Sequence, residues 1–175
     1  MKTAITAAAR FPVAFAFAHL LVFPSSAQNN SQPSAAPKGS PMTSHAAGTF
    51  EVKLIPQSQG EKAEGPALAR FSFDKQFHGD LEATGKGEML ADGPDAKGSG
   101  AYVAIERVTG TLGGRAGSFV LQHSGTLTRG ATELSITVVP DSGTGQLEGL
   151  TGKLNVIITN GKHSYEFDYS LPDSR

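Results

Sequence analysis

Apolar side chains recur at every second position along most of the chain after residue 48, and glycine-containing turns interrupt this alternation at intervals. A period of two is typical of β-strands that bury one face. It predicts eight strands, over residues 48–56, 68–77, 81–91, 98–112, 115–128, 131–140, 150–159 and 162–171. A short turn of helix is expected only within GQLEGL, residues 145–150.

The turns test whether neighbouring strands pair. Gly113-Gly114, Arg129-Gly130 and Asn160-Gly161 are two-residue turns of the kind that closes a tight hairpin. Each keeps the apolar positions of its two strands on one face. The Gly113-Gly114 turn, for example, sets Ala104 opposite His123.

The turn between the second and third strands is predicted to have three residues, His78-Gly79-Asp80. This length sets Lys75 opposite Ala83 and Phe73 opposite Gly85. A slip of one residue would move a whole strand's apolar set to the other face, so the agreement among the hairpins supports an antiparallel meander.

Eight sequential antiparallel strands that share an apolar face can close into a barrel, which removes exposed edges. We therefore expect an all-β, eight-stranded antiparallel up-and-down barrel. A two-sheet sandwich is the competing architecture, and the short hairpin connections favour the barrel. The interior of an eight-stranded barrel either fills with side chains or holds one small ligand.

The amino-terminal segment has a different composition. Residues 1–27 carry Lys2 and Arg10, then an apolar run and small residues, which predicts a cleaved signal peptide. The run is shorter than the roughly 20 residues of a spanning helix, so no membrane span is expected after cleavage. Residues 28–47, rich in Ser, Pro and Ala, are predicted to be a flexible linker, and 48–172 the barrel domain. We expect a periplasmic or secreted protein; with no cysteine, its core must be stable without disulfides.

Charge and motifs narrow the function classes. Removing residues 1–27 lowers the Lys+Arg count from 15 to 13 against 16 Asp+Glu, and no basic run exists, which excludes typical nucleic-acid binding. His78, Asp80 and Glu82 gather near one turn, but their spacing matches no zinc signature. No nucleotide fingerprint or nucleophile elbow is complete, so neither a cofactor nor a metal is expected.

The face assigned to the interior carries three titratable side chains among apolar ones: Lys75, Glu106 and His123. A lone buried carboxylate is very costly, so Glu106 is expected to have Lys75 and His123 as partners. Three interpretations stay open: a polar network in a packed barrel, a wet pocket among aromatic side chains, or an inverted assignment of the faces.

In the pocket interpretation, Glu106 and His123 are the candidate catalytic residues, able to exchange protons with a bound molecule. The candidate ligand-binding residues are Lys75, Tyr102, Phe73, Phe119, Tyr165 and Tyr169.

The opposite face has apolar positions of its own. Val103, Ile105, Val120, Val139 and Ile157 are predicted to point outward. Such a patch is typical of an oligomer contact, and it also fits the β-propensity of a solvated face.

Three segments carry a resemblance: ARFSFDKQFHGDLEATGKGEML, AYVAIERVTGTLGGRAGSFVLQHSGT and VVPDSGTGQLEGLTGKLNVII. With them, residues 48–172 resemble a bacterial family of unknown function (DUF3224), which is similar in fold to allene oxide cyclase and dirigent proteins. The resemblance implies an eight-stranded barrel with a lumen, often a trimer.

In allene oxide cyclase a lumenal carboxylate and an ordered water steer the cyclisation of a fatty-acid epoxide, and dirigent proteins bind phenolic radicals or quinone methides. Glu106 is the candidate for that carboxylate, although no residue-by-residue alignment supports the transfer. Because the family has no established reaction, this analogy concerns the fold.

These observations favour an exported barrel that binds a small apolar or aromatic molecule in its lumen, oriented by Glu106, His123 and Lys75. Two alternatives remain. One is a cofactor-free isomerase or cyclase that uses Glu106 or His123 as acid and base. The other is a non-catalytic structural or partner-binding barrel with a packed lumen, which uses its outer apolar patch, for instance to form a homo-oligomer.

Overall fold

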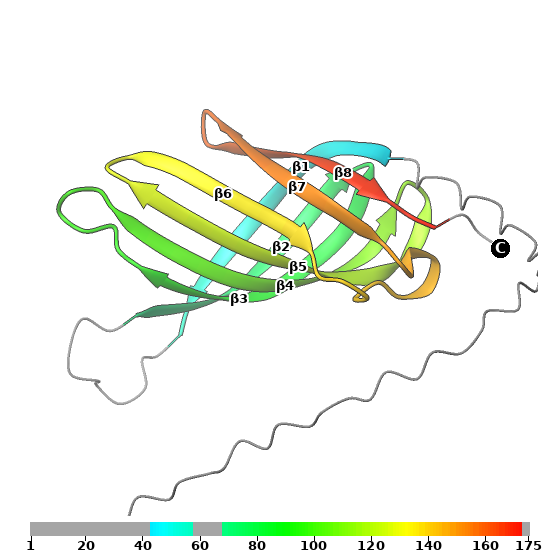
Figure 1. The fold of residues 1–175 in the computed structure, drawn as a ribbon, viewed down its shortest axis with the longest axis horizontal. Coiled ribbons are helices and arrows are strands. Elements are labelled where there is room, and N and C mark those ends of the chain that lie inside the picture. Colours follow the sequence, from blue (N-terminus) through cyan, green and yellow to red (C-terminus); the bar gives the residue numbers. More distant parts are fainter. Residues whose placement is uncertain (1–42, 58–67, 173–175) are drawn as a thin grey trace, which may run out of the picture. The chain divides into compact units, whose positions relative to one another are not determined.

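Eight antiparallel strands, each paired with the next and the last with the first, close into a barrel in the computed structural model, which describes residues 43–57 and 68–172 (Figure 1). The predicted up-and-down barrel is confirmed, and the sandwich is excluded. The strands are β1 (Thr43–Pro56), β2 (Ala69–Gly79), β3 (Leu81–Asp92), β4 (Gly100–Leu112), β5 (Arg115–Thr128), β6 (Ala131–Val138), β7 (Thr151–Thr159) and β8 (Lys162–Ser170). The expected helical turn is the 3₁₀ helix η1 (Gly145–Leu147). No helix in these ranges is long and apolar enough to cross a membrane.

The first strand begins earlier than predicted. Residues 43–47, assigned to the linker from their composition, belong to β1 and pair with β8, where Ala46 lies opposite Phe167. Ala46 is buried, but its small side chain among Ser and His gives little alternation signal. The rest of the predicted linker and the predicted signal peptide lie outside the described residues.

Three predicted hairpin registers are confirmed, and one is corrected. Ala104 lies opposite His123, and the Arg129-Gly130 and Asn160-Gly161 hairpins also have the expected pairs. In the β2–β3 hairpin, however, Lys75 lies opposite Gly85, not Ala83, and Phe73 opposite Gly87. The connection is longer than three residues: the last pair between these strands is Phe77↔Ala83, so residues 78–82 form the turn, and Gly79 has a positive φ of 112° within it.

The interior is filled at one end of the barrel and open at the other. In the filled half, large side chains pack with almost no exposure: Phe77, Leu81, Leu112, Phe119, Tyr165 and Phe167. At the other end, Leu54 and Ile158 occupy inward positions of the alternation but are 52% and 64% exposed. We call this open end the mouth.

The barrel is closed unequally around its circumference. β4 and β5 pair along their whole length, whereas β6 and β7 share only the pairs Ile136↔Leu154 and Thr137↔Lys153. Beyond these pairs β6 and β7 diverge (yellow and orange in Figure 1). We call this contact the β6–β7 seam.

Candidate functional site

Two glycines of β3 bring Lys75 and Glu106 together. Lys75 on β2 lies opposite Gly85, and Glu106 on β4 lies opposite Gly87, so β3 runs between the two side chains. A Cβ atom at Gly85 would collide with Glu106 Oε1, and one at Gly87 would collide with the Phe73 ring. Because β3 has no side chain at these positions, Lys75 Nζ crosses it and donates a hydrogen bond of 2.8 Å to Glu106 Oε2.

His123 completes the cluster from β5. It lies diagonally from Glu106, whose direct partner on that strand is Leu121, and diagonal neighbours are within reach of long side chains. His123 Nε2 is 3.0 Å from Glu106 Oε2, so the same carboxylate oxygen contacts both bases. The side chains of Glu106, His123 and Lys75 are 0%, 5% and 10% exposed. We call these three residues the ionic cluster.

The cluster keeps Glu106 ionised. Burial is the largest single influence on its pKa and acts to raise it, but His123 and the Lys75 charge together outweigh burial and lower the pKa below the ordinary 4.5. The Lys75 ammonium also lies 5.0, 5.4 and 5.5 Å from the ring centroids of Phe50, Phe73 and Phe77, close enough for cation–π attraction.

Two polar atoms of the cluster are incompletely satisfied. Glu106 Oε1 and His123 Nε2 are buried without a well-formed hydrogen bond among the described residues, although Nε2 lies only 3.0 Å from Glu106 Oε2. Each such atom in a folded protein requires an explanation, a catalytic or ligand-binding role among them.

A cavity of about 190 Å³ lies between the ionic cluster and the mouth. We call it the lumen cavity. Its polar lining comes from Lys75, His123, Tyr102 and His163, and the remaining walls are apolar. These apolar residues are Phe50, Val52, Leu54, Phe73, Met89, Ala104, Leu134, Ile136, Val156 and Ile158. Glu106 does not line the cavity but lies behind Lys75 and His123.

The predicted site residues divide between the two halves of the barrel. Phe73, Lys75, Tyr102 and His123 line the lumen cavity. The other predicted residues do not, and Glu106 acts on the cavity only through its two partners. The geometry makes His123 the group best placed to exchange a proton with a molecule in the cavity.

Three predicted ligand-binding residues lie in the filled half. The Phe119 ring stacks on the Phe167 ring with 5.9 Å between their centroids, and the Tyr169 ring packs on Phe167 with a centroid distance of 5.4 Å. The Tyr165 hydroxyl accepts a hydrogen bond from the Leu81 backbone N–H at 2.9 Å, which ties β8 to the β2–β3 hairpin. These contacts are structural.

Sequence reasoning missed His163 as a site residue. It lines the lumen cavity, with its ring 5.0 Å from that of Phe50. The Asn160-Gly161 register already placed it on the inner face, so a signal existed. Gly85 and Gly87, at alternate inward positions of one strand, were a second sequence signal of the site, because inward glycines leave room for large side chains from the flanking strands.

Among the described residues, no group of three His, Cys, Asp or Glu side chains could hold a metal ion. At the hairpin tip singled out from the sequence, His78 Nδ1 lies 3.4 Å from Glu82 Oε2, and both side chains are more than half exposed.

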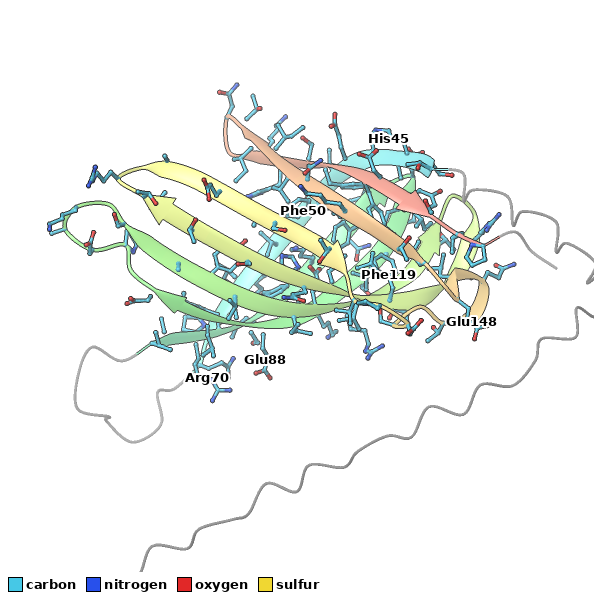
Figure 2. All side chains as sticks on the ribbon, viewed as in Figure 1. His45, Phe50, Arg70, Glu88, Phe119 and Glu148 are labelled. Carbon is cyan, nitrogen blue, oxygen red and sulfur yellow. The ribbon has the colours of Figure 1, made fainter. Side chains whose placement is uncertain are left out.

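A second hollow lies on the outer surface of β3, β4 and β5. It has a volume of about 660 Å³, and its apolar lining includes Leu90, Val103, Ile105 and Val120. Val103 and Ile105 are 55% and 53% exposed, in agreement with their predicted outward direction. Arg70, Lys86, Glu88 and Arg107 also line this hollow, and Figure 2 shows Arg70 and Glu88 projecting from the barrel wall. We call it the outer groove.

Comparison with known proteins places this barrel in a family. The family model described as "Protein of unknown function (DUF3224)" matches residues 46–169. A crystal structure of a protein with unknown function from the DUF3224 family of Shewanella oneidensis MR-1 is similar at 46% identity and a TM-score of 0.71, over 76% of this chain and 100% of that one. The comparison with curated proteins gives no match. The chain therefore belongs to the DUF3224 family, a family of β-barrel proteins of unknown function.

Proposed function

We propose that the protein binds one small apolar or aromatic molecule in the lumen cavity. The observation that carries this proposal is an apolar-walled cavity with buried polar groups at its inner end. Small-molecule sites typically combine such walls with a few convergent polar groups that fix the ligand's orientation. Lys75 and His123 supply those groups, and Glu106 holds them in place.

The size of the cavity limits the ligand. Its volume of about 190 Å³ exceeds the roughly 150 Å³ of an engineered cavity that holds benzene. It is smaller than the roughly 300–1,000 Å³ of sites for drug-sized molecules. A single substituted ring fits this space, and a longer molecule would extend through the mouth past Leu54 and Ile158.

A cavity-filling variant tests the proposal. Ala104 lines the cavity, so A104L adds apolar volume there, whereas A101L adds the same volume on the exposed outer face of β4. In native mass spectrometry of protein purified from its host, we expect wild type and A101L to carry a bound small molecule and A104L to lose it. Equal retention by A104L, with wild-type circular dichroism, would refute lumen binding.

A cofactor-free isomerase or cyclase is the second candidate. It is favoured by the position of His123, which lines the cavity and lies within 3.0 Å of a carboxylate that can orient it. With the molecule recovered from the host protein, E106Q separates binding from catalysis. Retained affinity with lost conversion supports an enzyme, and conversion unaffected by E106Q and H123Q argues against it.

The outer groove supports a contact between copies of this chain. Its apolar floor is exposed, and Glu88 and Arg107 in its lining provide opposite charges that can meet across two copies. We expect I105E to dissociate an oligomer in light scattering, while T109E, outward on the same strand but outside the groove, leaves it intact. A wild-type monomer at micromolar concentration would refute this contact.

The pattern of residues 1–27 supports export to the periplasm or medium. We expect mature protein in these fractions to begin at residue 28. Retention of residues 1–27 in the cytoplasmic fraction would contradict export.

A further inference from the structure

We propose that the lumen cavity takes a small monocyclic organic acid, bound as its anion, and that His123 takes up one proton from solvent when the anion binds. This inference rests on the lumen-binding function proposed above and names the chemical class of the ligand.

The titratable side chains that line the cavity are biased toward bases. They are Lys75, His123 and His163, together with the phenol of Tyr102. No acidic side chain of the described ranges is part of the lining. The nearest carboxylate, Glu106, lies behind the bases, and its Oε2 is occupied by both. An anion thus meets cationic and hydrogen-bond-donating groups before it meets the buried carboxylate.

Lys75 has N–H donors that are free to bind a ligand. An ammonium group has three N–H donors, and Lys75 uses one of them on Glu106. Its other close neighbours are the faces of Phe50, Phe73 and Phe77, which accept no conventional hydrogen bond. A carboxylate that enters the cavity can therefore receive a charge-assisted hydrogen bond from Lys75 without displacing Glu106.

Charge balance then requires a proton. Lys75 and Glu106 already cancel each other, so an incoming anion would leave one uncompensated negative charge in an apolar space, which is very costly. Imidazole is the side chain that gains a proton most readily near neutral pH. His123 is 3.0 Å from the Glu106 carboxylate and lines the cavity, so its protonation restores neutrality beside both anions.

The groups that surround His123 come from several strands. Glu106 on β4 is its charged neighbour, and Lys75 on β2 contacts the same carboxylate oxygen. The centroids of the Phe73 ring and the imidazole are 6.3 Å apart, and Tyr102 and His163 line the same cavity. In this proposal the ligand's anion is the added charge that favours the imidazolium form.

Matched acid and amide probes test the ligand class. Benzoate and 3-phenylpropanoate have the ring and the charge, and benzamide and 3-phenylpropanamide have nearly the same shape without the charge. By isothermal titration calorimetry at pH 7.5, we expect at least tenfold tighter binding of each acid than of its amide. Titrations in buffers of different ionisation enthalpy should report uptake approaching one proton for the acids and none for the amides.

The dependence on pH has a defined sign. Carboxyl groups with an ordinary pKa of about 4 stay ionised between pH 6 and pH 8, so only the protein's protonation changes there. We expect acid affinity to rise as the pH falls from 8 to 6, because the imidazolium forms more easily, and amide affinity to stay constant.

Three variants locate the proton. H123Q keeps an amide donor toward Glu106 but cannot titrate, so proton uptake and the pH dependence of acid binding should disappear. H78Q, at an exposed hairpin tip, should bind as wild type. E106Q removes the charge that cancels Lys75, so the acids should bind more tightly and without proton uptake.

The outcomes separate this inference from the function on which it rests. Amides that bind as tightly as acids, or proton uptake that persists in H123Q and is lost in H163Q, would overturn the inference while lumen binding stands. Failure of all four probes to bind the wild type would count against lumen binding itself.

Discussion

Replacement of Gly85 by alanine probes how the ionic cluster is assembled. The added methyl group would occupy the position of Glu106 Oε1 and approach the Phe77 ring, with a carbon-to-carbon distance of 3.2 Å. The carboxylate must then move, and Lys75 and His123 both contact its other oxygen. A one-carbon change on β3 therefore disturbs an ion pair between β2 and β4.

The magnitude follows from three opposing effects. In an ordinary strand, replacing glycine by alanine stabilises the fold by roughly 0.5–1 kcal/mol. Overpacking of a filled interior costs about 1–3 kcal/mol. Displacing Glu106 from Lys75 forfeits part of the roughly 3–5 kcal/mol lost when a buried charge loses its partner. We expect G85A to lower the free energy of unfolding by about 2–4 kcal/mol.

A double-mutant cycle in chemical denaturation measures this effect. E106A removes the carboxylate that the methyl group would strike, so G85A in the E106A background should change stability by about 1 kcal/mol or less. The coupling between the two sites should therefore be about 1 kcal/mol or more. Equal effects of G85A in both backgrounds, or stabilisation of the wild type by G85A, would show that β3 does not hold Glu106 as described.

Three further predictions concern the same barrel. Because the pKa of Glu106 is lowered in the folded state, its ionisation stabilises the fold above about pH 4.5, and this contribution is lost as the pH falls through the folded-state pKa. In denaturation curves at pH 3–7, the difference in stability between wild type and E106Q should therefore shrink as the pH falls. K75M should destabilise the fold by about 3–5 kcal/mol, and K75M/E106L should recover most of this loss in the same assay. Y165F should lower the stability of the fold by about 1–3 kcal/mol in thermal denaturation, because the Leu81 N–H loses its acceptor. Y169F is the control and should lower the stability less, because the Tyr169 hydroxyl has no such partner among the described contacts.

Alternation and turn chemistry were sufficient for the fold because both are local signals. Strand positions, three hairpin registers and the inward direction of Glu106 and His123 follow from them. The β2–β3 register could not be decided this way. A shift of two residues keeps every side chain on its face, so a three-residue turn (78–80) and the observed five-residue turn (78–82) satisfy the pattern equally. That shift nevertheless places Lys75 beside Gly85, from which it reaches Glu106.

The division of the barrel interior into a filled half and an open half could not be predicted from local sequence patterns either. Phe119 and Tyr165 alternate inward like Phe73 and Tyr102, yet only the last two line the lumen cavity. Which end of a barrel fills depends on how strands from distant parts of the sequence end and diverge around it. Periodicity within one strand carries no information about that arrangement.

The short pairing of β6 with β7 makes one side of the barrel wall the weakest. Breaking two residue pairs costs far less than separating strands joined along their whole length, so local opening should begin there. Both strands of the β6–β7 seam line the lumen cavity, β6 with Leu134 and Ile136 and β7 with Val156 and Ile158. A molecule bound in the lumen as proposed would therefore leave sideways between β6 and β7, and its residence time would be governed by how often these two strands separate.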